Sequence, residues 1–427
     1  MEIPQSLKNR IAYYSSRLAD RPALCELYAN CCASTIATAV RKCEDGTFFV
    51  LTGDIPAMWL RDSAAQVTHY IPLADDPEIA AIIEGVIRRQ FMYIGIDPYA
   101  NAFNREPNGE GHKEDLPAIG PWVFERKYEV DSLCYPLRLL YLFWRKTGDR
   151  AVAVIKECLE KAVRIILDLW KTEQHHADKS PYFFMRIADG MTEESYPNGG
   201  KGSPVKYTGM IWSAFRPSDD GCEYGYLTAS EMFAVVALGY AAEMLRNVCE
   251  NDSLANECEA LRDEIDTGIK KYCIVNNEKY GPIYACETDG LGNYSMIDDA
   301  NIPSLLSIPY IGYASADDVI YKNTRRFLLS SDNPYYYSGK YAMGVGSPHT
   351  PPRYVWHMAL VMQALTSTNA SEKRELIETI ASTDGGKRHL HEGFNVDNPC
   401  EYTREWFTWP EALFAEFAEK CADEGII

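Results

Sequence analysis

The sequence predicts an all-α protein whose helices form an (α/α)6 barrel, a toroid of six helical hairpins. Two observations predict this fold. Apolar residues recur with helical spacing along most of the 427 residues, and the connections between helical segments alternate between short and long. Short connections make neighbouring helices antiparallel, so the long connections must all emerge at the same end of the barrel. We therefore expect a single domain over residues 1–427 with one elaborated end.

The expected helices follow one another along the whole chain. A polar helix at about 5–19 comes first, and the twelve barrel helices are expected at 23–43, 60–73, 77–93, 128–147, 150–176, 223–247, 253–276, 300–311, 315–330, 352–368, 371–384 and 404–421. The long connections are those at 44–59, 94–127, 177–222, 277–299, 331–351 and 385–403. Their composition leaves room only for short β-hairpins, for example at 48–51 and within 277–296.

Composition narrows the class of ligand. The chain has 42 basic and 61 acidic residues and a net charge of −19, so neither nucleic acid nor an anionic membrane surface is an expected partner. Hydrophobic residues make up 46% of the chain, enough for a large core, and there are 28 Tyr, 15 Phe and 8 Trp. A neutral ligand such as a sugar suits this balance, and no obligate protein partner is expected.

The N-terminal residues and the cysteines predict a cytoplasmic protein. The first residues contain no basic region followed by an apolar run. No apolar stretch approaches the roughly 18 residues that a membrane helix needs. The thirteen cysteines are an odd number without a C-x-x-C pair, which indicates reduced thiols packed in the core.

The most informative stretch is Phe215–Tyr226. Asp219 and Asp220 are adjacent, Arg216 precedes them, aromatic residues flank them, and an apolar helix is expected directly afterwards. One of the two acids is either the N-cap of that helix, close to its positive dipole end, or part of a site. The arginine and the aromatic residues favour a site, because catalytic carboxylates need neighbours that fix their geometry and separate their pKa values.

Hydrolysis of a glycosidic bond needs two carboxyl groups, one protonated to release the leaving oxygen and one ionised. Glu392 lies between His391 and Gly393 in a long connection without helical pattern, where it is either a catalytic carboxylate or an ordinary exposed side chain. The acids expected at the elaborated end are Asp54, Asp62, Asp219, Asp220, Asp298, Asp299 and Glu392.

Several other side chains are candidates for sugar binding. Trp59 and Arg61 open a helix together with Asp62, either as the lining of a sugar pocket in which Asp62 holds Arg61, or as a buried tryptophan beside a capping aspartate. Arg126 follows Trp122 and Phe124 in a similar but weaker pattern. His349 is a candidate partner for a sugar hydroxyl or a structural histidine.

No metal or cofactor is expected. His175 and His176 end a helix and are expected to be solvated, and His389 and His391 alternate without a partner at ligand spacing. Asp298 and Asp299 do not form a regular calcium loop, and phosphate-loop, dinucleotide-binding and nucleophile-elbow motifs are absent from the sequence.

Six ordered motifs resemble glycoside hydrolase family 125, whose members are exo-acting α-1,6-mannosidases on an (α/α)6 barrel. The motifs are GDIPAMWLRDS at 53–63, DPYANAFN at 97–104, FRPSDD at 215–220, DDANIPSLLSIPY at 298–310, GSPHT at 346–350 and HEGF at 391–394. The resemblance implies metal-independent removal of a terminal α-1,6-linked mannose, with inversion at the anomeric carbon. The implied substrates are N-glycan fragments or mannan-derived oligosaccharides.

The same resemblance assigns roles to residues. It implies that Asp219 is the general acid, with Asp220 in reserve, and that Glu392 is the general base. It also implies that Arg61, Asp62 and His349 line the mannose pocket. With the candidates taken from the sequence itself, the residues expected to bind substrate are Asp54, Trp59, Arg61, Asp62, Asn101, Arg126, Arg216 and His349.

Two other functions remain open. One is a sugar epimerase or isomerase on the same barrel, with His349 or His391 as the base. It predicts proton exchange at a sugar carbon and no released monosaccharide. The other is a mannoside-binding protein without catalytic activity, which predicts binding without turnover.

Overall fold

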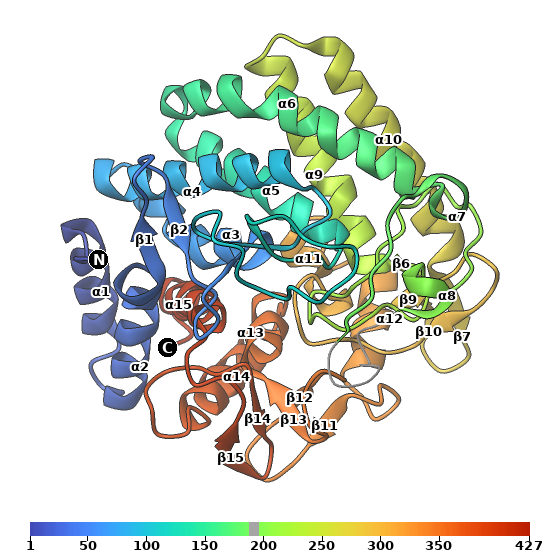
Figure 1. The fold of residues 1–427 in the computed structure, drawn as a ribbon. Helices are drawn as coiled ribbons and strands as arrows, with labels where there is room; N and C mark the ends of the chain where they lie inside the picture. The colour runs from blue at the N-terminus through green and yellow to red at the C-terminus, as the bar shows by residue number, and fades with distance from the viewer. Residues whose placement is uncertain (188–195) are drawn as a thin grey trace.

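A computed structural model describes residues 1–187 and 196–427, and it arranges the helices in two concentric rings (Figure 1). Successive inner elements pack against one another, and the last contacts the first. The inner ring consists of α3 (Leu60–Thr68), α5 (Val130–Thr147), α9 (Thr228–Asn247), η3 (Leu305–Ser307) with α11 (Ile308–Ile311), α13 (His357–Leu365) and α15 (Thr408–Asp423).

The outer ring packs against the inner one. Its helices are α2 (Pro22–Ser34), α4 (Pro77–Ile96), α6 (Asp149–Glu173), α10 (Asp252–Tyr272), α12 (Val319–Leu328) and α14 (Ala370–Ser382). Each of α4, α6, α10, α12 and α14 follows an inner element after a short connection, and each long connection leads from an outer helix back to the inner ring. The alternation expected from the sequence is confirmed, and so is the (α/α)6 barrel.

The other helical elements are short or peripheral. α1 (Gln5–Arg17) packs outside the ring against α2 and α15, so residues near both ends of the chain lie together (Figure 1). The remaining elements are η1 (Thr35–Ala39), η2 (Ile71–Leu73), α7 (His176–Lys179) and α8 (Pro197–Gly200).

The fourth inner helix is shorter than the sequence predicts. In place of a helix over 300–311, the chain is irregular until η3 begins at Leu305. Ile302 precedes Pro303, and a residue before proline is disfavoured in the α-conformation. Ser304 caps η3. The carboxyl group of Asp298 accepts hydrogen bonds from the N–H groups of Leu305 and Leu306, at 3.0 and 3.2 Å.

Two other helix boundaries also correct the sequence reading. The helix expected over 23–43 ends at Ser34 and passes through η1 into strand β1. The helix expected from residue 223 begins only at Thr228, because Tyr226 and Leu227 form a strand. Asp219 and Asp220 therefore do not cap this helix, and the interpretation that placed them at its N-terminus is wrong.

Short antiparallel strands stiffen the long connections. The hairpins expected near residue 48 and within 277–296 are confirmed as β1–β2 and β9–β10. The pair β7–β8 begins at Ile274, inside the helix expected over 253–276, which ends at Tyr272. The strands are β1 (Val40–Lys42), β2 (Phe48–Val50), β3 (Met58–Trp59), β4 (Ala102–Phe103), β5 (Val123–Glu125), β6 (Tyr226–Leu227), β7 (Ile274–Asn277), β8 (Gly281–Tyr284), β9 (Glu287–Thr288), β10 (Tyr294–Ser295), β11 (Tyr336–Ser338), β12 (Met343–Val345), β13 (Tyr354–Trp356), β14 (Gly393–Asn395) and β15 (Asn398–Tyr402).

Two of these small sheets join different connections next to inner helices. In the sheet β3–β4–β5, Trp59 pairs with Ala102, which pairs with Glu125. In the sheet β13–β14–β15, Trp356 pairs with Gly393, the residue after Glu392. Backbone hydrogen bonds thus bring Trp59 and Trp356 to the starts of α3 and α13.

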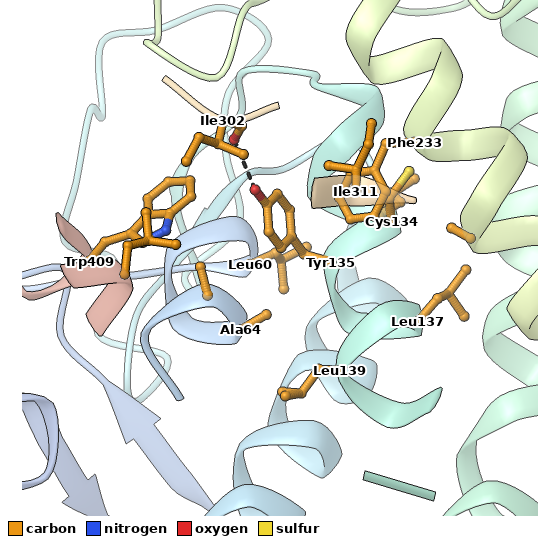
Figure 2. Packing of buried hydrophobic residues seen from close by; sticks show 14 of the residues in the cluster. Leu60, Ala64, Cys134, Tyr135, Leu137, Leu139, Phe233, Ile302, Ile311 and Trp409 are labelled. Carbon is orange, nitrogen blue, oxygen red and sulfur yellow. Dashed lines mark hydrogen bonds between the residues drawn. The ribbon is translucent and has the colours of Figure 1, made fainter. Parts of the chain in front are cut away.

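Large side chains of the inner helices fill the barrel (Figure 2). Tyr135 of α5 packs edge-on against Phe233 of α9 and Trp409 of α15, with ring centroids 4.9 and 5.9 Å apart. Its buried hydroxyl donates a 3.0 Å hydrogen bond to the carbonyl of Ile302. Such aromatic packing ties three inner elements to the irregular segment before η3. Among the described residues, no helix combines the length and the apolar character needed to cross a membrane.

Candidate active site

A small pocket opens at the barrel end where the long connections emerge, and most of its lining comes from the sequence motifs. Three acidic residues that the sequence singled out line it together: Asp62 of α3, Asp219 of the connection before β6, and Glu392 of the connection before β14. The complete lining is Thr52, Ile55, Trp59, Arg61, Asp62, Ser218, Asp219, Asn301, Trp356, Glu392, Arg404 and Phe407.

Asp219 is held in an unusual backbone conformation. Its φ is +73°, in the left-handed region that residues other than glycine rarely occupy. Its N–H donates to the carbonyl of Arg216 at 2.9 Å, and its own carbonyl accepts from Lys127 Nζ at 2.9 Å. Backbone strain of this kind persists where the surroundings over-determine it, and it is concentrated at functional sites.

The carboxyl group of Asp219 faces polar partners and the pocket. Its Oδ1 lies 3.5 Å from Asn101 Nδ2 and 3.8 Å from Arg61 Nη2. The side chain is 28% exposed, so it can reach a ligand in the pocket.

Glu392 lies in a more enclosed position. Its side chain is 9% exposed, and its Oε1 lies 3.8 Å from Arg404 Nη1. Burial raises the pKa of Glu392, although the charges of Arg404 and His349 oppose the rise. The negative charge of Asp219 also raises the pKa of Glu392, so the two carboxyl groups interact electrostatically across the pocket.

A buried cluster of charges surrounds Arg61. The guanidinium forms an ion pair with Glu129 and lies 3.5 Å from Asp62, 3.7 Å from Asp131 and 3.8 Å from Asp219. One cation thus faces four carboxyl groups. Burial raises the pKa values of Glu129 and Asp131, and it raises the pKa of Asp62 to about 6. These buried carboxyl groups therefore hold their protons to a higher pH than exposed carboxyl groups do.

The sequence did not single out Glu129 and Asp131. Both stand at the beginning of α5, where acidic residues are ordinary because they interact favourably with the helix dipole. The only signal that could have identified them was their alternate spacing at the start of a helix, next to the helix expected to carry Arg61.

Asp220 points to a different partner. Its Oδ1 lies 2.8 Å from Nδ1 of His349, and neither residue lines the pocket. Burial lowers the pKa of His349, but the hydrogen bond and charge of Asp220, with Asp219 and Glu392, outweigh this and raise it to about 9. His349 is therefore an imidazolium cation at neutral pH.

Some expected binding residues support the lining from behind. Asn101 is buried and donates to Glu125 at 3.0 Å, as well as approaching Asp219. Asp54 accepts two hydrogen bonds from Arg404, at 2.6 and 2.9 Å, and so orients this lining residue. Gly53 permits the tight turn there, because a Cβ at this position would lie 2.1 Å from the carbonyl oxygen of Trp406.

The two remaining arginines lie outside the lining. Arg216 forms a buried ion pair with Glu287 at 2.5 Å. Arg126 pairs with Asp97 at 2.6 Å, and its guanidinium lies over the ring of Tyr99. Both arginines anchor the connections that carry the pocket.

The lining also contains residues that the sequence analysis missed. Arg404, Trp356 and Phe407 bring a cation and two aromatic faces to the pocket, and the Arg404 guanidinium lies 4.1 Å from the Phe407 ring centroid. All three lie in or beside segments that read as ordinary helix starts, so their types alone gave no sign of a site.

The pocket combines apolar faces with uncommitted polar atoms. Trp59 Nε1 and Asp62 Oδ2 are buried and have no hydrogen-bond partner in the described part of the chain, although Asp62 Oδ2 lies 3.5 Å from Arg61 Nε. Buried polar atoms are normally satisfied, so a donor and an acceptor left open in one pocket indicate a polar ligand. With the rings of Trp356 and Phe407, they match a ligand that has both hydroxyl groups and apolar C–H faces.

Histidines outside the pocket have structural partners. His176, expected to be solvated, is instead buried: its Nδ1 lies 2.6 Å from Glu173, and its ring stacks on Trp212. His389 pairs with Glu411 at 2.5 Å, and the ring of His391 stacks on Tyr402. Within residues 1–187 and 196–427, no group of three His, Cys, Asp or Glu side chains is arranged to hold a metal ion.

Comparisons with known proteins agree on one family. The model of the family described as metal-independent alpha-mannosidase (GH125) matches residues 21–418. The meiotically up-regulated gene 157 protein of Schizosaccharomyces pombe is 37% identical over 433 residues, covering 96% of this chain and 84% of that protein.

Solved structures extend this result. A Streptococcus pneumoniae metal-independent α-mannosidase, in a non-productive complex with α-1,6-mannobiose, is 46% identical and superimposes with a TM-score of 0.95 over 99% of both chains. A glucoamylase from Saccharomycopsis fibuligera is 10% identical, with a TM-score of 0.57 over 89% of both chains. The second likeness concerns the fold alone.

Proposed function

Because the chain belongs to the metal-independent α-mannosidases of glycoside hydrolase family 125, we propose that it removes terminal α-1,6-linked mannose from oligosaccharides by an inverting, exo-acting mechanism. The chain is a glycoside hydrolase, and the α-1,6 linkage follows the mannobiose bound by its S. pneumoniae relative. The observation that carries the mechanism is the position of Asp219 and Glu392, two carboxyl groups from distant segments that line one pocket.

The proposed reaction uses the two carboxyl groups in opposite roles. Protonated Asp219 gives its proton to the glycosidic oxygen as the bond from that oxygen to the anomeric carbon breaks. Ionised Glu392 takes a proton from a water molecule, whose oxygen forms the new bond on the opposite face of the sugar. The products are β-mannose and the shortened oligosaccharide. A raised pKa suits Glu392, because a general base is most effective when its pKa lies near the working pH.

Other lining residues would hold the mannose. The open hydrogen-bonding atoms of Trp59 and Asp62 are suited to sugar hydroxyls, and Trp356 and Phe407 offer apolar faces. Arg61 would fix the orientation of Asp62 and Asp219 from inside the barrel. Because long connections enclose the pocket, it suits a chain end, which supports exo action.

Asp220 is the alternative acid. Its hydrogen bond to His349 and its absence from the lining favour Asp219. We propose that Asp220 keeps His349 protonated, and that the positive charge of His349 in turn attracts both catalytic carboxyl groups.

Time-resolved NMR with α-1,6-mannobiose tests the reaction. The proposal predicts that the anomeric proton signal of β-mannose appears first and that the α-anomer follows by mutarotation. If α-mannose appears first, the inverting mechanism is wrong. Proton exchange at a sugar carbon without free mannose would support the epimerase, and binding without turnover would support a mannoside-binding protein.

The epimerase alternative has less support. His349 is protonated near neutral pH through Asp220, so it is a poor base, and His391 does not line the pocket.

Two isosteric variants test the assigned roles. Asp219→Asn and Glu392→Gln each remove a proton-transfer group while keeping the shape of the site, so we expect kcat to fall by about 10²–10⁴-fold. Circular dichroism and thermal unfolding serve as the folding controls. Turnover near the wild-type level in either folded variant would remove that residue from the mechanism.

We also propose that the whole chain, 1–427, folds as one catalytic domain and acts in the cytoplasm on N-glycan fragments or mannan-derived oligosaccharides. Limited proteolysis tests the first statement, because a second domain would be released intact. Cell fractionation with antibody detection tests the second.

A further inference from the structure

Lys127 is a buried lysine directly behind the candidate acid. It is 2% exposed, and its Nζ donates a 2.9 Å hydrogen bond to the main-chain carbonyl of Asp219. The same ammonium lies 3.7 Å from Glu125 and 5.2 Å from the centroid of the Phe215 ring, which belongs to the segment that carries Asp219. Lys127 itself does not line the pocket.

The carbonyl that Lys127 holds belongs to the residue with the strained backbone. At φ +73°, the direction of the Asp219 side chain depends on contacts that keep its peptide groups in place. The N–H side of Asp219 is held by a neutral hydrogen bond to Arg216. The carbonyl side is held by a charged donor, which makes the stronger bond.

A second connection links Lys127 to the carboxyl group of Asp219. The Lys127 N–H donates to Asn101 Oδ1 at 3.1 Å, and Asn101 Nδ2 lies 3.5 Å from Asp219 Oδ1. Glu125 accepts from the same amide at 3.0 Å. Lys127, Asn101 and Glu125 therefore form one buried network that touches both the backbone and the side chain of Asp219.

We propose that Lys127 is a positioning residue for proton donation: it holds the backbone of Asp219 so that the carboxyl group meets the glycosidic oxygen. This inference rests on the proposed role of Asp219 as general acid. It assigns Lys127 no contact with substrate and no proton transfer.

The inference predicts a dependence on the leaving group. Proton donation matters most when the leaving group is a weakly acidic alcohol, such as the hydroxyl of a second sugar. It matters least when the leaving group is an acidic phenol such as 2,4-dinitrophenol. A misplaced acid therefore slows hydrolysis of α-1,6-mannobiose much more than that of 2,4-dinitrophenyl α-mannoside. A general loss of structure slows both substrates alike.

The experiment compares kcat on these two substrates for the full chain and its variants. We expect Lys127→Met to lower kcat on mannobiose at least tenfold and on the dinitrophenyl mannoside less than threefold, because a small displacement of a catalytic group is costly only when that group is needed. Lys127→Arg keeps a charged donor, so it should recover much of the loss. If Lys127→Met does not fold, Lys127→Gln, which keeps a neutral donor, is used for the same comparison.

Arg186→Met is the matched control. Arg186 lies 2.8 Å from the same Glu125 oxygen and 2.9 Å from Asp115. The ratio of the two kcat values should stay at the wild-type level. A ratio that changes as it does in Lys127→Met would mean that the charge on Glu125, rather than the hydrogen bond to Asp219, is responsible.

Asp219→Asn separates the two proposals. If this variant loses activity equally on both substrates, Asp219 is not the acid, and the proposed function and the inference are both wrong. If it discriminates between the substrates while Lys127→Met slows both equally, the proposed function stands and the inference about Lys127 is wrong.

Discussion

The two ends of the barrel treat buried charge differently. At the loop end, one cation, Arg61, faces four carboxyl groups in and beneath the pocket. At the opposite end lies a larger cavity, of about 610 Å³, which is also lined by charged residues. There, however, the lining holds three cations and three carboxyl groups, and two pairs form among them: Arg10 pairs with Glu419, and Lys420 pairs with Glu416.

The size of a cavity therefore does not identify the active site. The larger cavity has a mainly apolar lining of side chains such as Ile71, Leu73 and Leu142, with balanced ion pairs around them. The smaller pocket contains carboxyl groups that burial leaves undercompensated, and their pKa values are raised. Burial raises the pKa of Glu419 in the larger cavity as well, so a raised pKa alone does not distinguish the two ends. The excess of carboxyl groups around one cation does distinguish them, and such an excess in a cleft is typical of acid–base catalysis.

The largest effect is expected when the cation at the centre of the loop-end cluster, Arg61, is removed. Arg61→Met leaves buried carboxyl groups without their shared partner, so we expect the free energy of unfolding to fall by about 3–5 kcal/mol at pH 7. Displacement of Asp62 and Asp219 should also lower kcat/KM by at least about 10²-fold. Urea denaturation and mannobiose kinetics measure the two effects. A stability loss under about 1 kcal/mol would show that the cluster is not energetically coupled.

Asp62 offers a sharper test, because its ordinary pKa of 3.8 is raised by burial to about 6. Between these values the folded state binds more protons than the unfolded state, so the wild type loses stability as pH rises from 4 to 7. The rise in pKa from 3.8 to about 6 corresponds to roughly 3 kcal/mol. We expect the stability of Asp62→Asn, relative to wild type, to increase by up to that amount across this range.

The measurement is urea unfolding of both proteins at pH 4, 5, 6 and 7. Activity should fall despite the gain in stability at neutral pH, because Asp62 supplies an open acceptor in the pocket. Parallel stability curves for the two proteins over this range would refute the raised pKa.

Much of this architecture could be predicted from the sequence, because the alternation of connection lengths is a local property. The alternation predicted the barrel and the end that carries the pocket. The positions of Asp219, Glu392 and Asp62 in or next to long connections predicted that all three lie at that end. The short fourth inner element and the late start of α9 were missed. In both places, proline chemistry or strand pairing overrode an apolar pattern of helical appearance.

Pairing between distant segments could not be predicted in this way. Arg216 precedes Asp219 by three residues, yet it pairs with Glu287, while Arg61 approaches Asp219 from far along the chain. Glu129 and Asp131 resembled ordinary residues of a helix start. Which cation meets which carboxylate depends on how six connections fold over one another, and spacing within one connection does not report it.

A smaller effect is expected from the imidazolium at the edge of the pocket. The charge of His349 lowers the pKa of Glu392, so His349→Asn should raise it and move the acidic limb of kcat/KM upward by about 0.5–1 pH unit. Asp220→Asn should act similarly, because it removes the partner that keeps His349 charged. The pH profiles of the two variants test this, and a loss of 10²-fold or more at every pH in Asp220→Asn would instead make Asp220 the acid.

The stability contribution of His349 falls with rising pH, as that of Asp62 does, but over a higher pH range. The pKa of His349 is raised from 6.5 to about 9, so its stabilising effect is complete below pH 6.5 and is lost as pH rises through 9. The wild type should therefore lose stability relative to His349→Asn between these values. Thermal unfolding from pH 6 to pH 10 measures this difference, and an unchanged difference would contradict the assigned charge.

The smallest effect on activity is expected from a substitution at the end of the barrel opposite the pocket. Arg10→Met leaves the nearly buried Glu419 without its cation, so stability should fall by about 1–3 kcal/mol. Kinetics should stay within about twofold of wild type, because a matched pair far from the pocket has no part in proton transfer. The double variant Arg10→Met with Glu419→Gln should be more stable than Arg10→Met alone, since no uncompensated charge remains. A tenfold change in kcat/KM in either variant would mean that the end of the barrel opposite the pocket is coupled to catalysis. The contrast between paired and excess charge would then no longer separate structure from function in this barrel.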